Sequence, residues 1–204
     1  MKKIFLICFL FTISQTSLAQ VSGGVKAGVN LSKINDKVID YDFRTGFYVG
    51  GFANIEFAEK LSFQPEILFS MQGAKADNFQ TNRIDEHGQI FPDDFTDIDY
   101  KLIYINLPLM IKYNFIKKLN FEFGPQIGFA IKHEITTKNE LLGTMKGEPD
   151  SNIDLGVNIG LEYNFYQGFG LNFRYNTGLI NIDKNSDWRN KNSVFSLGIS
   201  YKFF

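Results

Sequence analysis

The chain has 204 residues, of which 44% are hydrophobic and 16% aromatic, with 22 Phe, 9 Tyr and 18 Gly. Its 21 basic and 22 acidic residues give a net charge of −1, so the charge balance indicates no nucleic-acid partner. Aromatic residues and glycine are abundant, whereas the residues that helices prefer are scarce, which favours β-structure.

The amino-terminal residues predict a cleaved secretory signal peptide. Two lysines precede the uninterrupted apolar run 4–11 and a short polar stretch. Ser17 and Ala19 provide the small side chains that signal peptidase requires, so we expect cleavage between Ala19 and Gln20. The apolar run is too short to span about 30 Å of hydrocarbon as a helix. We therefore expect export through the inner membrane.

Cleavage at this point divides the chain into a signal peptide, 1–19, and one mature domain, 20–204. The mature domain lacks Cys8, the only cysteine, and so has no disulfide and no catalytic thiolate. Loss of Lys2 and Lys3 leaves 19 basic and 22 acidic residues, a net charge of −3.

No apolar stretch of the mature domain approaches the length of a membrane helix, so a bilayer crossing would require a closed barrel. Apolar residues instead recur at every second position, the period of a β-strand. Eight segments show this pattern: 25–31, 47–57, 61–71, 103–113, 119–131, 153–163, 169–175 and 195–203. We predict an all-β fold, a closed up-and-down antiparallel transmembrane β-barrel of eight strands.

The connections alternate between short and long. Short turns are expected near 58–60, 116–118 and 166–168, and longer loops at 33–43, 74–99, 133–151 and 181–192. This asymmetry is typical of barrels in the outer membrane, and it places both termini on the periplasmic side. The loop 74–99 is long enough for an extra hairpin, which would make ten strands.

Aromatic residues at the apolar positions of the alternating pattern predict two interfacial girdles. One lies beside the short turns and the other farther along the strands: Phe57, Phe63, Tyr113, Phe121, Tyr163, Phe169 and Tyr201, then Phe47, Phe69, Phe129 and Phe195. Three prolines, Pro65, Pro108 and Pro125, fall inside strands, where each removes a backbone donor. We expect bulges or local breaks there, which could reverse the facing of the residues beyond them.

The positions between the apolar residues of each strand are mostly polar, and they predict a charged lumen with equal numbers of cations and anions. These charged residues are Lys26, Glu56, Glu66, Lys112, Glu122, Lys132, Asp154, Glu162, Arg174 and Lys202. Charges removed from bulk water need partners, and an eight-stranded barrel has little room besides side chains. A packed polar plug is the favoured interpretation, and a proton or small-ion path the alternative.

No catalytic residues, cofactor or ligand-binding residues are predicted. The two histidines, His87 and His133, lie outside any metal-ligand or nucleophile spacing. The segment 76–99 carries seven acidic residues and one arginine, so Asp93, Asp94, Asp97 and Asp99 form a weak candidate cation site, with a solvated acidic loop as the simpler interpretation.

The carboxy terminus alternates apolar residues up to Tyr201, Phe203 and the additional Phe204. It resembles the signal by which outer-membrane barrels are recognised for assembly. Several internal phrases resemble the PorT-like outer-membrane β-barrel family. These are KAGVN at 26–30, QPE at 64–66, QGAK at 72–75, LPL at 107–109, GPQ at 124–126 and RYNTGLINI at 174–182. The resemblance implies that the three prolines belong to the barrel, and its namesake takes part in protein secretion, although fold alone does not assign that role.

We therefore expect a non-enzymatic protein integral to the cell outer membrane, with an envelope-structural, surface-interaction or secretion-accessory role. Its expected partners are outer-membrane lipid and the barrel-assembly machinery, with envelope or secretion proteins as further candidates. The alternatives are a periplasmic lipocalin-like lipid-binding barrel, which would carry the apolar set inside, and a lipid-modifying outer-membrane enzyme.

Overall fold

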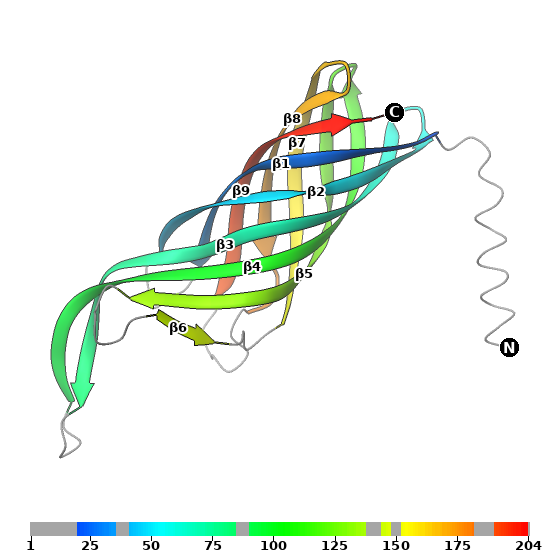
Figure 1. Ribbon diagram of the computed structural model, residues 1–204. Helices are drawn as coiled ribbons and strands as arrows, with labels where there is room; N and C mark the ends of the chain where they lie inside the picture. The colour runs from blue at the N-terminus through cyan, green and yellow to red at the C-terminus, as the bar shows by residue number, and fades with distance from the viewer. Residues whose placement is uncertain are drawn as a thin grey trace, which may run out of the picture.

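The computed structural model describes residues 20–35, 41–84, 90–137, 144–147, 152–181 and 190–203. These residues form antiparallel strands joined by turns and loops (Figure 1). The strands are β1 Gln20–Asn35, β2 Asp42–Ala58, β3 Leu61–Ile84, β4 Ile90–Ile116, β5 Leu119–Thr137, β6 Thr144–Gly147, β7 Ile153–Tyr166, β8 Phe169–Gly178 and β9 Lys191–Lys202. No helix among them is long and apolar enough to cross a membrane. The predicted signal peptide lies outside the described residues.

Eight of these strands close into a barrel. Each pairs antiparallel with its neighbours along the chain, β5 pairs with β7, and β1 pairs with β9 to complete the ring. Closure leaves no sheet edge within the wall, so every strand there exchanges backbone hydrogen bonds on both sides. The predicted closed, eight-stranded, up-and-down architecture is confirmed, and β6 is a short additional strand that pairs with β5 outside the ring.

The connections at one end are two-residue turns. They join β2 to β3, β4 to β5 and β7 to β8 at residues 59–60, 117–118 and 167–168, as the sequence predicts. Gln167 and Gly168 both have positive φ values, of 20° and 85°, and the glycine reaches this conformation without a steric penalty. β1 begins and β9 ends at this same end, because Gly24 pairs with Lys202. We refer to it as the turn end, and to the other as the loop end.

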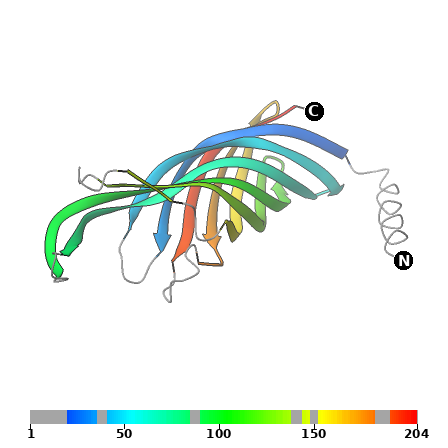
Figure 2. The same ribbon diagram turned by 60° about the horizontal axis from the view of Figure 1, so that its bottom comes forward.

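The prediction of a loop at 74–99 is wrong, because β3 and β4 continue through most of it as a paired hairpin. β2 pairs with β3 only as far as Lys75, and β5 pairs with β4 as far as Ile98. Beyond that level β3 and β4 pair with each other alone, and we call residues 76–84 and 90–97 the ribbon. Figure 2 shows it curving away from the barrel. It lengthens two existing strands, so the ring keeps eight strands rather than the alternative ten.

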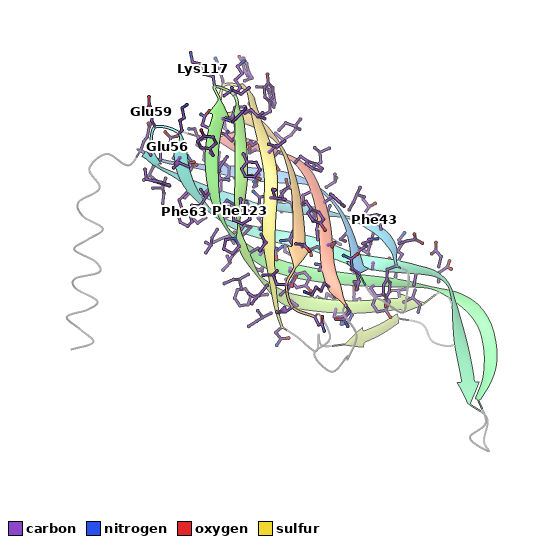
Figure 3. The ribbon with its side chains drawn as sticks, turned by 180° about the vertical axis from the view of Figure 1, so that it is seen from behind. Phe43, Glu56, Glu59, Phe63, Lys117 and Phe123 are labelled. Carbon is purple, nitrogen blue, oxygen red and sulfur yellow. The ribbon has the colours of Figure 1, made fainter. Side chains whose placement is uncertain are left out.

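Apolar side chains cover the outside of the barrel, and polar side chains fill its interior. Ile67, Ile159 and Leu171 are 63%, 46% and 45% exposed, whereas inward residues of the same strands are buried. Phe43, Phe63 and Phe123 are labelled on the wall in Figure 3, and Glu59 and Lys117 at the turn end. This facing suits a barrel surrounded by hydrocarbon and contradicts the lipocalin-like alternative, in which the apolar set would point inward.

Aromatic side chains cluster toward both ends of the wall. The ring centroids of Phe169 and Tyr201 lie 4.6 Å apart near the turn end, and those of Tyr175 and Phe195 4.7 Å apart toward the loop end. Phe47 and Phe69 are neighbours at this second level, with centroids 6.2 Å apart. Their positions correspond to the two predicted girdles.

The three prolines interrupt pairing without shifting the register. On either side of Pro108, the partners on β3 and β5 follow the same register. Pro65 and Pro125 likewise lie in segments of constant register. The predicted bulges at the prolines are therefore wrong, and the expected local breaks consist only of missing ladder pairs. A proline lacks one donor but fits the extended backbone, which explains this outcome.

Candidate functional site

The centre of the barrel is occupied by a buried cluster of charged side chains. Arg174 on β8 donates to both carboxylate oxygens of Glu66 on β3, at 2.8 and 2.9 Å, and to Glu122 on β5 at 2.8 Å. Lys26 on β1 donates to the same Glu66 at 3.0 Å. The side chains of both glutamates are 0% exposed. The fork of a guanidinium matches two carboxylates, so this geometry satisfies most of the charge within the lumen.

A second ion pair lies toward the turn end and is joined to the first. Lys112 on β4 forms a salt bridge with Glu162 on β7 and also donates to Gln64 at 3.1 Å. The amide of Gln64 then donates to Glu66 at 2.7 Å. We call Lys26, Glu66, Lys112, Glu122, Glu162 and Arg174 the lumen cluster. It holds three cations and three anions from six strands, so it ties opposite sides of the barrel together.

Uncharged polar groups continue this network toward the loop end. Asn30 donates to Ser70 at 2.9 Å and accepts from Ser196 at 2.8 Å. Asn176 donates to Asn158 at 3.1 Å, and Asn192 donates to Gln72. Tyr48 crosses the barrel and donates to Asn172 at 2.6 Å. Its ring is one of several bulky groups at inward-facing positions, together with the side chains of Tyr104 and Met110, and our site prediction did not use this signal in the sequence.

The lumen is hollow at the turn end and filled above it. A cavity of about 520 Å³ opens between the short turns and is lined by Lys112, Glu162 and Ser200 at its inner side. A second space of about 30 Å³ lies among Asn30, Tyr48 and Arg174, which is room for about one water molecule. Arg174 and its partners lie between them, so the cluster closes the barrel.

The structure brings together six of the ten charged residues predicted for the lumen, and these six form the lumen cluster. Asp154 is also buried, at 8% exposure, but lies apart from them toward the loop end, at the start of β7. Glu56 and Lys202 face each other across 3.7 Å at the turn end, where their side chains are 44% and 43% exposed. They line the open cavity rather than the buried core.

The prediction that Lys132 lines the lumen is wrong. Tyr104 of β4 pairs with Ala130 and Ile103 with Lys132, so Ile131 is an extra residue that makes a bulge in β5. One inserted residue reverses the alternation beyond it. Lys132 therefore lies on the outer wall, where it forms a 2.6 Å ion pair with Glu134.

The loop end offers no metal site among the described side chains, in which no group of three His, Cys, Asp or Glu could hold an ion. Of the four candidate aspartates, Asp99 accepts from Arg44 at 2.6 Å, and Asp97 is half-buried. The side chains of Asp93 and Asp94 lie outside the described set, as does His87. His133 is paired with Leu102, and its ring stacks on Tyr100 with centroids 6.4 Å apart.

The carboxy-terminal strand ends on the outer wall of the turn end. Tyr201 is 37% and Phe203 54% exposed, and their ring centroids are 5.6 Å apart. The backbone N–H of Phe203 donates to the carbonyl of Gly23 at 2.8 Å, which fastens the end of the chain to β1. Phe204 lies outside the described residues.

A closed polar lumen inside an apolar wall is typical of small outer-membrane barrels. Comparison with known proteins also places the chain among outer-membrane barrels. The sequence model of the family named outer membrane protein beta-barrel domain matches residues 13–184 of this chain. The chain belongs to this family. Family membership implies an outer-membrane location, whereas the finer resemblance to PorT-like proteins stays a prediction.

Solved barrels from other bacteria share this architecture. Neisserial surface protein A matches with 16% identity and a TM-score of 0.56, over 90% of this chain and 99% of that one. Ail of Yersinia pestis, solved in complex with the heparin analogue sucrose octasulfate, matches with 14% identity and a TM-score of 0.52, over 90% and 99%. A major outer membrane protein from Thermus thermophilus matches with 12% identity and a TM-score of 0.50, over 90% and 100%. At these identities the likeness concerns the fold alone. No curated protein matches the chain significantly.

Proposed function

We propose that this protein is a non-porous, non-enzymatic outer-membrane barrel that holds its ribbon outside the cell for contacts with other molecules. The observation that carries the proposal is the contrast between the two halves of the molecule. The lumen is closed by Arg174, Glu66 and Glu122, whereas β3 and β4 extend well past their neighbours at one end only. A barrel that offers no passage but projects structure from one rim is suited to binding at that rim.

The orientation follows from the turns and the termini. Outer-membrane barrels have short periplasmic turns and longer extracellular connections. The turn end therefore faces the periplasm, and the ribbon and β6 face the outside. A role as an accessory to secretion, implied by the PorT-like resemblance, would use the same exposed surface and is the second candidate.

The charge of the ribbon region favours a basic partner. Residues 76–99 carry seven acidic side chains and one arginine. Ail was solved with a sulfated ligand, but a polyanion of this type would be repelled by so acidic a segment. A basic protein surface or a layer of cations has the complementary charge.

An enzymatic role has little support from the wall. A lipid-modifying enzyme of this size would need a histidine and a serine together on its lipid-facing side. Among the described side chains, His133 has inward parity because it pairs with buried Leu102. Most described serines, such as Ser32, Ser70 and Ser200, have inward parity as well. Ser193 of β9 shares the outward parity of Phe195. Among the described side chains, its hydroxyl contacts Tyr175 and Asn35 rather than a histidine.

Protease treatment of intact cells tests this proposal. Cleavage should occur within residues 76–99 and should be absent at the turn 59–60, and cells permeabilised to expose the periplasm provide the matched control. Cleavage at the turn in intact cells would invert the barrel and overturn the proposed role of the ribbon. Lipid analysis of a deletion strain tests the enzymatic alternative, and a missing lipid modification would favour it.

A further inference from the structure

Charged side chains gather on the outer wall near the loop end, where a membrane protein usually carries apolar ones. The ammonium of Lys132 lies 2.6 Å from one carboxylate oxygen of Glu134, and that of Lys101 lies 3.5 Å from the other. These residues share one side of the wall, because Lys101 pairs with Glu134 and Lys132 with outward-facing Ile103. Neither lysine contributes to the lumen cluster or to the ribbon.

The bulge at Ile131 creates this arrangement. Without the extra residue, Lys132 would continue the inward parity of Gln126 and Gly128. The bulge instead brings Lys132 and Glu134 outward, opposite Lys101 of the next strand. Bulges often redirect a side chain at a barrel rim to a functional position.

The position of the group corresponds to a membrane interface. Phe129, a member of the girdle near the loop end, precedes Lys132 by three residues on the same strand, and its partner is Ile105. A strand rises about 3.3 Å per residue, so Lys132 lies roughly 10 Å along its strand from Phe129 at the aromatic level. Lys101 lies roughly 13 Å along its strand from Ile105 at the same level. Lipid headgroups occupy this level, and long basic side chains extend into it from the apolar wall.

The charges of the group favour an anion. Among the described side chains, two ammonium groups share the single carboxylate of Glu134, so these three groups together carry one net positive charge. The carboxylate is the most enclosed of the three, with a side-chain exposure of 15%, against 32% for Lys101 and 47% for Lys132. Glu134 therefore holds the two lysines in place, while both lysine side chains stay partly exposed. Each ammonium has three donors, and a phosphate oxygen is a strong acceptor for them.

We propose that Lys101 and Lys132, positioned by Glu134, bind the phosphate group of a phosphorylated lipid headgroup in the leaflet at the loop end. The apolar wall below receives the acyl chains, and the ammonium groups above receive the phosphate. A soluble phosphate would gain only the second of these contacts, so the site is specific for a lipid. Binding at this position would fix the depth and tilt of the barrel beside its ribbon.

The test uses the full mature chain, folded in detergent, and two probes, lipid A with both phosphates and the same lipid without phosphates. Native mass spectrometry measures how much of each lipid the barrel retains. The parent should retain the phosphorylated lipid preferentially. The double variant Lys101→Gln with Lys132→Gln should lose about tenfold or more of this retention, because each lysine near a membrane surface contributes appreciably to headgroup attraction. Retention of the unphosphorylated lipid should not change.

Two further variants separate a site from general charge. Lys101→Arg with Lys132→Arg keeps the cations and should retain the phosphorylated lipid. Lys60→Gln with Lys118→Gln removes the same charge at the turn end and should leave retention unchanged. The proposal is overturned if the glutamine pair at 101 and 132 binds like the parent, if the turn-end pair weakens binding equally, or if inorganic phosphate at millimolar concentration displaces the lipid. Heat-modifiable migration in gels verifies that each variant is folded.

Discussion

The four ionic groups at the centre of the lumen depend on one another. Arg174 faces two carboxylates, and Lys26 is close to only one of them. In a low-dielectric interior a charge without a partner costs several kcal/mol, so a buried cluster is sensitive to the loss of any one member. Glu122 is the most dependent, because its second oxygen has no hydrogen-bond partner in the structure and its first is bound by Arg174.

Replacement of Arg174 by Met should therefore destabilise the barrel by about 3–5 kcal/mol, because it strands the buried carboxylate of Glu122 and leaves Glu66 with Lys26 as its only cation. Urea-induced unfolding in lipid vesicles measures this loss. Lys202→Met is the matched control: its ion pair is half-exposed, and a surface pair contributes about 0–1 kcal/mol. Adding Glu122→Gln to the Arg174 variant should recover part of the stability. A loss below about 1 kcal/mol for Arg174→Met would contradict the geometry of the cluster.

On the outer wall, the facing of a single residue can be tested with a charge. Ile159 is 46% exposed in the middle of β7, between Phe123 of β5 and Tyr175 of β8. Arginine at this position should cost about 2–4 kcal/mol, because it would lie among acyl chains near the bilayer midplane. Gln167→Arg, at the exposed turn, should cost little. If both variants unfold at the same urea concentration as the parent, Ile159 does not face hydrocarbon.

At the scale of the strand, the alternation of apolar residues gave the correct architecture because the bilayer enforces it. Each residue in the wall meets either hydrocarbon or the polar lumen, so the period of two is strong from Val25 to Leu31 and again from Ile153 to Tyr163. The ribbon lies beyond the bilayer, where both faces can meet water, and its pattern is weaker. This is the physical reason why residues 76–99 were predicted as a loop.

The bulge at Ile131 could not be derived from the sequence either. The side chains of Ile131 and Lys132 can each face either the lumen or the outside. The prolines, which the sequence does show, leave the register of the strands unchanged. In the candidate site, the six residues of the lumen cluster could be predicted from the alternation of inward and outward positions alone. Their partners could not, because contacts such as Arg174 with Glu66 depend on strand stagger and barrel closure.

The last strand completes both the ring and the turn-end girdle. Tyr201 pairs with Val25 of β1 and with Phe169 of β8, and its ring contacts that of Phe169. Deletion of residues 201–204 should leave unassembled protein in the periplasm, because it removes the terminal pairs and the aromatic end expected to be recognised for assembly. Outer-membrane fractionation and heat-modifiable migration measure the result. Deletion of Phe204 alone should be mild, since Phe203 ends the alternation. Normal recovery of the longer deletion would contradict this role.

For the whole molecule, the closed lumen means that the barrel shape does not by itself provide a transport pathway. The barrel is wide enough at the turn end for a cavity of about 520 Å³, whereas the space that lies on the other side of Arg174, among Asn30 and Tyr48, has a volume of about 30 Å³. The wall therefore does not limit passage; the side chains of Arg174 and its partners do. An ion that entered from the turn end would meet a neutralised cluster of three cations and three anions, and it would have to break salt bridges to proceed.

The purified protein should accordingly form no stable conductance in planar lipid bilayers. A variant with alanine at Glu66, Glu122 and Arg174 removes the obstruction but leaves buried Lys26 without its carboxylate partner, and it should conduct in discrete steps if it folds. Lys202→Ala, which alters only the open mouth, should stay silent. Reproducible single-channel steps from the parent would show that the cluster opens, and would restore the small-ion path. The measurement on the parent decides the question even if the triple variant fails to assemble, because the parent contains all the salt bridges that would close the lumen.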